Sequence, residues 1–130
     1  MSRFTQGELE VMRILWAHGE LKPADIHKHF PRKIKNPSLR SYLVILLEKG
    51  HVVRRRVGKA YFYRAKTRRE STFRSMIRDL TRVCCDGSVE TLLCHLIRSE
   101  KLSEADLLEL KRLSEENASA ANPVKEEAKL

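Results

Sequence analysis

Residues 36–63 of this 130-residue chain, NPSLRSYLVILLEKGHVVRRRVGKAYFY, predict a helix joined directly to a basic β-hairpin. The pattern places an N-cap at Asn36, Pro37 in the first turn and the helix end at Gly50. The apolar residues of the helix recur at helical spacing and are Leu39, Leu43, Leu46 and Leu47. After Gly50, valines and arginines, a Gly58-Lys59 turn and alternating residues AYFY predict two antiparallel strands. A helix followed at once by a basic hairpin is typical of a winged helix-turn-helix.

The residues before this segment supply the other helices of such a module. Thr5 and Glu8 match a capping box, and the helix that they open ends at Gly19. Its predicted apolar face carries Leu9, Met12, Leu15 and Trp16. Pro23 opens a short second helix. The predicted fold class is mainly α with a small β-hairpin, and residues 1–66 form a winged helix-turn-helix DNA-binding domain.

Residues 67–117 predict three further amphipathic helices, which are too short to form a second core alone. We therefore expect a C-terminal helical dimerisation region that packs against a second copy in a homodimer. The alternative is a single-chain bundle folded back on the N-terminal domain. The predicted dimerisation residues are Phe73, Ile77, Leu80, Val89, Leu92, Leu93, Leu96, Leu107 and Leu110. The polar residues 118–130 predict a disordered tail.

The net charge of +9 is unevenly distributed. Residues 1–83 contain 20 Lys and Arg against 7 Asp and Glu, which gives +13. Residues 84–130 contain 6 against 10, which gives −4. The basic part indicates a polyanionic partner. Because aromatic residues are few, a stacking platform for single strands is poorly supplied, and double-stranded DNA is the expected partner.

The outward face of the helix from Pro37 is expected to enter the major groove. Ser38 and Ser41 are candidate donors to base edges or phosphates, and Arg40 suits guanine or a phosphate. Val44 and Ile45 suit thymine methyl groups. The alternative for this apolar pair is an ordinary surface position or a contact within the protein.

The hairpin carries four candidate phosphate contacts, which are Arg54, Arg55, Arg56 and Lys59. Such contacts position a protein on DNA without selecting a sequence. Strand alternation places Arg54 and Arg56 on one face. No acidic residue lies near this cluster in the sequence, which favours a phosphate partner over a merely solvated surface.

Four stretches of the chain occur in a characteristic order: TQGELEVMRILW (5–16), SLRSYLVILLEKG (38–50), GKAYFY (58–63) and DGSVETLLCHLIRSEKLS (86–103). In this order they resemble the penicillinase-repressor family, which includes β-lactamase, methicillin-resistance and copper-responsive repressors. The resemblance covers about residues 4–116. It implies a homodimeric transcriptional repressor that binds a palindromic operator.

The resemblance also implies a signalling partner, because many members are cleaved in the dimerisation helices after a membrane sensor with a metallopeptidase domain is activated. The β-lactam-responsive members are cut at an Asn-Phe bond, and His95-Leu96 occupies the corresponding position here. The family often has Thr or Asn and then Arg where this chain has Val44 and Ile45, so an operator sequence does not follow. The paired Cys-x-Cys motifs of copper-responsive members are absent from the sequence.

The sequence contains no nucleophile motif, phosphate-binding glycine loop or metal-ligand spacing, so we expect no enzyme activity, catalytic residue, metal or cofactor. Cys84, Cys85 and Cys94 are expected to be buried, reduced thiols, with redox sensing as the alternative. The chain has no long apolar run and no signal-peptide pattern. We therefore expect a cytoplasmic protein without membrane insertion.

Two rival functions remain at this point. A nonspecific, architectural DNA-binding protein would explain why few side chains on the outward helix face are good base readers. A protein-interaction adaptor would use the winged helix to bind another protein.

Overall fold

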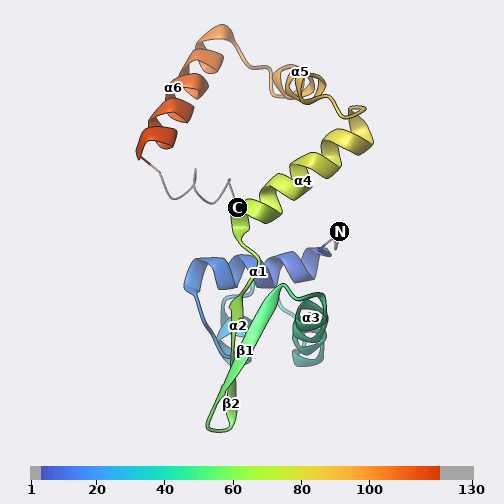
Figure 1. The fold of residues 1–130 in the computed structure, drawn as a ribbon, viewed down its shortest axis with the longest axis vertical. Helices are drawn as coiled ribbons and strands as arrows, with labels where there is room; N and C mark the ends of the chain where they lie inside the picture. The colour runs from blue at the N-terminus through green and yellow to red at the C-terminus, as the bar shows by residue number, and fades with distance from the viewer. Residues whose placement is uncertain (1–3, 121–130) are drawn as a thin grey trace. The chain divides into compact units, whose positions relative to one another are not determined.

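The structure, a computed structural model, describes residues 4–120 and divides the chain into two compact units, Met1–Arg69 and Glu70–Leu130 (Figure 1). The first unit contains α1 (Gln6–His18), α2 (Pro23–Lys28), α3 (Asn36–Lys49), β1 (Val52–Val57) and β2 (Ala60–Ala65). The second contains α4 (Arg69–Cys84), which begins at the boundary, α5 (Val89–Ser99) and α6 (Glu104–Ala120). The predicted fold class is confirmed: a mainly α chain with a winged helix-turn-helix and a C-terminal helical region.

The ends of α1 follow the predicted local signals. The Thr5 hydroxyl accepts a hydrogen bond from the Glu8 amide at 3.3 Å, and the Glu8 carboxylate accepts one from the Thr5 amide at 3.3 Å. The helix ends at Gly19, which has φ 80° and donates its amide to the Leu15 carbonyl at 2.9 Å. The capping box and the helix end are therefore confirmed.

The start of α3 is shifted by one residue from the prediction. Lys35 is the N-cap, and Asn36 is already helical. The Lys35 carbonyl accepts hydrogen bonds from the amides of Ser38 and Leu39, at 3.0 and 3.3 Å, and no side chain caps the helix. The prediction of Asn36 as a side-chain cap was therefore wrong, because the backbone alone closes the first turn.

One apolar core holds the first unit together, where α1 contacts α2, α3 and β2. Its buried residues are Val11, Met12, Ile14, Leu15, Ile26, Leu39, Leu43, Leu46, Val52 and Tyr63. The predicted face of α1 was incomplete, since Val11 and Ile14 are buried whereas Leu9 and Trp16 are half-buried. Packing against several neighbours buries more of a helix than the single stripe that its periodicity indicates.

The hairpin pairs β1 with β2 in antiparallel register, so that Arg54 lies opposite Tyr63, Arg55 opposite Phe62 and Arg56 opposite Tyr61. Leu21 adds a single-residue bridge on β2. Its amide donates to the Tyr63 carbonyl at 3.0 Å, and its carbonyl accepts from the Tyr63 amide at 2.8 Å. This bridge fixes the base of the hairpin to the segment between α1 and α2.

The segment after β2 is held against the first unit by hydrogen bonds to His51 and Trp16. The His51 carbonyl accepts from the amides of Lys66 and Thr67, at 2.8 and 3.1 Å. His51 Nδ1 lies 2.7 Å from the Thr67 hydroxyl, and Trp16 Nε1 donates to the Thr67 carbonyl at 2.9 Å. These bonds fix the end of the unit up to Thr67.

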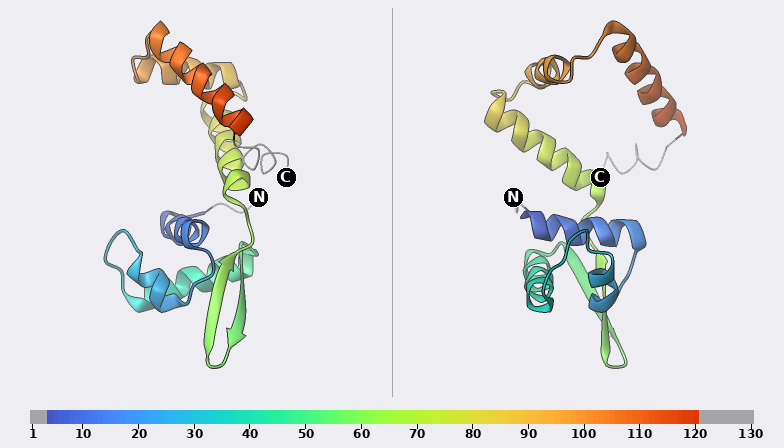
Figure 2. Two further views of the ribbon diagram at one scale, coloured as in Figure 1. Left: turned by 90° about the vertical axis from the view of Figure 1, so that its left-hand side faces the viewer. Right: turned by 180° about the vertical axis from the view of Figure 1, so that it is seen from behind.

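Serine side chains cap the first turns of α5 and α6. The Ser88 hydroxyl accepts from the Thr91 amide at 3.1 Å, and Ser103 and Asp106 cap each other reciprocally at 2.9 and 3.1 Å. Figures 1 and 2 show α4, α5 and α6 following one another, and no two of them pack along their length within the described residues. The apolar faces of these helices therefore lack a partner helix among residues 4–120.

The predicted disordered tail, residues 118–130, lies mostly outside the described residues, and α6 continues through Ala120. None of the helices among residues 4–120 is both long enough and apolar enough to cross a membrane.

Candidate nucleic-acid interface

The inner face of α3 is anchored by Leu39, Leu43 and Leu46, which are at most 3 % exposed. This packing determines which side chains point outward. Arg40, Ser41 and Val44 are exposed, and Val44 reaches 47 %. The structure therefore places these three predicted contacts on the accessible face of α3.

Two predicted contacts on α3 are less accessible. Ser38 and Ile45 are both half-buried. Ile45 is partly covered within the protein, so it is less accessible than Val44 for the predicted contact with a thymine methyl group. The alternative interpretation, a contact within the protein, applies to part of the Ile45 side chain.

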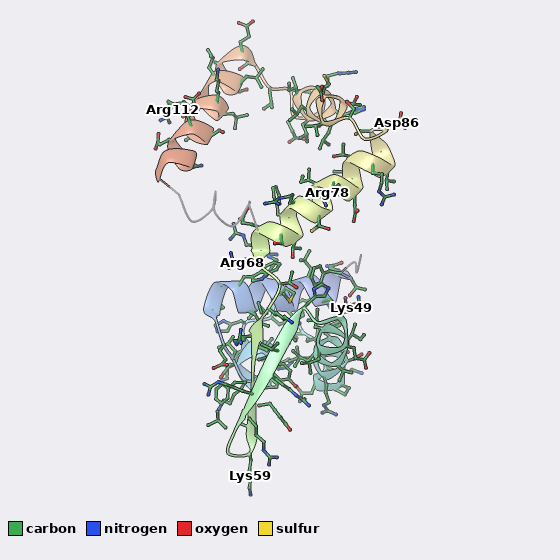
Figure 3. All side chains as sticks on the ribbon, in the orientation of Figure 1. Lys49, Lys59, Arg68, Arg78, Asp86 and Arg112 are labelled. Atoms are coloured by element: carbon green, nitrogen blue, oxygen red, sulfur yellow. The ribbon has the colours of Figure 1, made fainter. Side chains whose placement is uncertain are left out.

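The basic residues of the hairpin lie at different positions along its strands and on different faces. Lys59 lies at the turn, and its side chain extends beyond the tip in Figure 3. Arg54 and Arg56 share one face, as predicted, and both lie over the ring of Tyr61. The distances from the guanidinium carbons to the ring centroid are 4.2 Å for Arg54 and 6.0 Å for Arg56.

The tertiary structure corrects the inference that the basic hairpin has no acidic neighbour. Glu20, which is remote in sequence, forms an ion pair with Arg55 at 2.8 Å. The hydrogen bonds from Arg55 lower the pKa of the Glu20 carboxyl, so the pair stays charged at neutral pH. Within the described part of the chain, Arg55 is thus the one of the three consecutive arginines that forms an ion pair with an acidic residue.

A second arginine of the basic half is also paired. Arg32, in the connector between α2 and α3, forms a forked pair with Glu10 of α1, with donor–acceptor distances of 2.8 to 3.3 Å. These hydrogen bonds raise the pKa of Arg32. The connector is therefore fixed to α1, while Lys33 and Lys35 remain exposed on it.

A shallow groove of about 280 Å³ joins α3 to the hairpin. Its lining residues are Pro23, Ala24, Asn36, Leu39, Arg40, Leu43 and Tyr63. Arg54 Nη1 donates a hydrogen bond to the Tyr63 hydroxyl at 3.3 Å, so Tyr63 connects Arg54 to the groove that Arg40 lines. We refer to the exposed predicted contacts of α3 and the hairpin, Arg40, Ser41, Val44, Arg54, Arg56 and Lys59, together as the basic face.

Four residues at or beside the basic face were not predicted from the sequence: Asn36, Tyr61, Tyr63 and Glu20. Tyr61 and Tyr63 could have been found from strand alternation, because they share a face with Arg54 and Arg56. Nothing in the local sequence indicates Glu20, since the Glu20–Arg55 pair spans 35 residues.

Most predicted dimerisation residues are accessible in the single chain. Phe73 is 61 % exposed and Leu93 51 %. Leu80, Val89, Leu96, Leu107 and Leu110 lie between 38 and 52 % exposed. Ile77 is half-buried, and Leu92 is 8 % exposed. Leu92 therefore packs mainly within its own chain, whereas the seven exposed residues form apolar faces that nothing in the described part of the chain covers.

The cysteines differ from the expectation. Cys85 is buried, but Cys84 and Cys94 are exposed, and all three are free thiols. Cys84 ends α4, and Cys94 lies on the polar side of α5, so neither is covered within the single chain. Among the residues that the structure describes, no group of three or more His, Cys, Asp or Glu side chains is placed to hold a metal ion.

Comparison with known proteins assigns the chain to a family. The family model described as penicillinase repressor matches residues 4–116, which is nearly the whole chain. An uncharacterized 16.5 kDa protein in the ptsI 3′ region of Latilactobacillus sakei is 25 % identical over 122 residues, covering 92 % of this chain and 84 % of that protein. The family consists of DNA-binding transcriptional repressors, in agreement with the winged helix-turn-helix. The chain therefore belongs to the penicillinase repressor family.

Proposed function

We propose that the protein represses transcription as a homodimer that binds a palindromic operator on double-stranded DNA. The observation that carries this proposal is the connection between α3 and the hairpin through Tyr63. Arg40 of α3 and Tyr63 of β2 line the same groove, and Arg54 donates a hydrogen bond to the Tyr63 hydroxyl. A duplex that places its major groove on α3 would bring a phosphate backbone to the hairpin.

The residues of the basic face divide into two chemical roles. On α3, Arg40 is suited to a bidentate contact with guanine, Ser41 to a hydrogen bond and Val44 to a thymine methyl group. On the hairpin, Arg54, Arg56 and Lys59 are suited to phosphates. The first set would select sequence, and the second would supply affinity and register.

The homodimer is supported by the apolar faces of α4, α5 and α6. A soluble chain rarely leaves so many large apolar side chains accessible on adjacent helices unless another surface covers them. A second copy offers the same faces, and a two-fold interface is the commonest way for identical chains to pair. Two-fold symmetry would in turn match the two half-sites of a palindrome.

We also propose that a membrane sensor and a peptidase relieve repression, and the support for this step is the resemblance to the family. The His95-Leu96 bond lies within α5, and both side chains are exposed. Cleavage there would divide the helix that carries Leu93 and Leu96 and would weaken the dimer. Because a protease binds extended backbone, α5 would have to unwind locally before it is cut.

The decisive experiment is selection of bound duplexes from a random-sequence pool, followed by sequencing. We expect an inverted repeat with two half-sites about one helical turn, or a multiple of it, apart. Retained binding without enrichment would contradict sequence reading.

The architectural alternative is favoured by one observation. Among the α3 residues predicted to contact DNA, Arg40 is the one with a charged side chain. If the protein is architectural, footprinting would show uniform protection along the duplex. A discrete footprint of two half-sites would exclude the architectural alternative. The adaptor alternative would be excluded by tight duplex binding that weakens steeply with salt.

A further inference from the structure

The three consecutive arginines of β1 lie in two different environments. Alternation along the strand puts Arg54 and Arg56 on one face of the hairpin and Arg55 on the other. The face with Arg54 includes Tyr63, which also lines the groove beside α3. Arg55 instead lies opposite Phe62, with its guanidinium carbon 5.8 Å from the ring centroid. Adjacent positions in the sequence therefore face different surroundings.

Tyr61 contacts both arginines that lie on its face of the hairpin, Arg54 and Arg56. Its ring lies beneath both guanidinium groups, at 4.2 Å from Arg54 and 6.0 Å from Arg56. Arg56 Nε also donates to the Gly58 carbonyl at 2.9 Å. Cation–π contacts use the flat face of a guanidinium and leave most of its five N–H donors available. Both side chains are thus held in place while they keep donors for an anion.

The guanidinium group of Arg55 is already hydrogen-bonded to the carboxylate of Glu20. Its Nε lies 3.0 and 2.9 Å from the two carboxylate oxygens of Glu20, and its Nη2 lies 2.8 Å from one of them. A phosphate at Arg55 would have to displace this carboxylate and would be repelled by its charge. Glu20 directly precedes Leu21, whose backbone pairs with Tyr63. The ion pair therefore extends the attachment of the hairpin from its base toward its tip.

We propose that Tyr61 and Glu20 are positioning residues of the DNA interface. Tyr61 holds Arg54 and Arg56 ready for phosphates, and Glu20 uses Arg55 to fix the hairpin to the segment between α1 and α2. Arg55 is then an anchor of the hairpin and not a phosphate contact, unlike its predicted role. The inference rests on the proposed DNA-binding function.

The anchor role is tested by the salt dependence of binding to a mixed-sequence duplex. Arg54→Ala and Arg56→Ala should each reduce the slope of log affinity against log salt by about one. Arg55→Ala should leave the slope unchanged while it lowers the affinity. Arg55→Lys should resemble Arg55→Ala, because lysine keeps the charge but lacks the fork. A slope reduced by about one in Arg55→Ala, with binding restored in Arg55→Lys, would overturn the anchor role.

A second readout needs no DNA. Amide hydrogen exchange of residues 52–65 in the free protein should accelerate in Arg55→Ala and in Glu20→Gln, because each removes the ion pair between Glu20 and Arg55 that helps to hold the hairpin. Lys59→Ala is the matched control, since it removes a charge from the turn without touching Glu20. Exchange that is unchanged in both variants would overturn the anchor role, whereas failure of the wild type to bind any duplex would overturn the proposed function.

The role of Tyr61 is tested with a pair of variants that leave the charge unchanged. Tyr61→Phe keeps the aromatic ring and should bind duplex as the wild type does. Tyr61→Leu removes the ring face and should lower the affinity about two- to fivefold. Thermal unfolding of both variants checks that the first unit remains folded. Equal affinities for the two variants would show that Tyr61 does not position the arginines.

Discussion

Glu8 and Lys49 form an ion pair that joins the beginning of α1 to the end of α3. The Glu8 carboxylate is almost fully buried, with the residue 2 % exposed, and it accepts a hydrogen bond from Lys49 Nζ at 2.8 Å. Burial raises the pKa of Glu8, but the hydrogen bonds from Lys49 and Thr5 outweigh it, so the pKa is lowered overall. The carboxylate is therefore charged in the folded protein and depends on its partners.

Lys49→Met should lower the free energy of unfolding by about 1–3 kcal/mol, because it leaves a buried carboxylate without its main donor. Urea denaturation measures the loss. Adding Glu8→Gln to Lys49→Met should recover part of it, since the neutral amide is less costly to bury. Lys59→Met, which removes an exposed lysine, should have little effect. An equal loss in both lysine variants would show that the pair is not the cause.

The pH dependence of stability should show the contribution of His51. Burial, followed by the positive charge of Lys49, lowers the pKa of His51 below its ordinary value of 6.5, while Glu8 opposes this shift. The unfolded chain then binds a proton more readily than the folded one, so stability is complete above about pH 6.5 and falls as the pH drops toward the lower folded pKa.

Urea midpoints at pH 7.5 and 5.5 test this expectation. His51→Gln should flatten the change between the two pH values, and the exposed-site control His95→Gln should not. A drop in stability that is the same in His51→Gln and in the wild type would assign it to other groups. Further loss below the ordinary Glu8 pKa of 4.5 is expected from Glu8, whose folded pKa is also lowered.

Gly7→Ala should destabilise the first unit although alanine favours helices. Gly7 is buried in α1, and a Cβ atom there would overlap the ring of Tyr42 from α3. Alanine normally gains about 1 kcal/mol over glycine in a helix. Here overpacking should cost about 1–3 kcal/mol, measured by thermal or urea unfolding. In a Tyr42→Ala background the same change should become stabilising, and if it does not, the ring is not the obstacle.

Arg40→Ala and Lys59→Ala should affect DNA binding in different ways. Arg40→Ala should weaken binding to the selected operator by about 1–3 kcal/mol and relax the preference at one position per half-site. Lys59→Ala should weaken all sequences evenly and reduce the salt slope by about one. Repeating the duplex selection with each variant measures both effects. If Arg40→Ala weakens every sequence equally, Arg40 holds a phosphate and does not read a base.

Leu93→Asp should dissociate the proposed homodimer, because it places a charge at the centre of the apolar face of α5. Light scattering of the full chain gives the mass. Thr91→Asp is the matched control, since Thr91 is exposed and lies on the opposite side of the same helix. An unchanged mass in Leu93→Asp would move the interface away from this face.

Local patterns in the sequence were sufficient to predict the helices and strands and to identify most residues of the basic face. Leucine spacing identified the buried side of α3, and Gly50 and Gly58 marked the helix end and the turn, where φ is 79° and 63°. These features depend on neighbours a few residues apart, which is the range over which helical and strand periodicity acts. The exposure of Arg40, Ser41 and Val44 followed from the same spacing.

Tertiary contacts decided what the periodicity could not. The partners of Arg55 and Lys49 are 35 and 41 residues away, and Leu21 joins the sheet through one residue. No local pattern specifies such pairs, because they depend on how whole elements are packed. The sequence therefore determined a winged helix with a basic hairpin. Only the packing of the folded unit showed that Arg54 and Arg56 remain available whereas Glu20 binds Arg55.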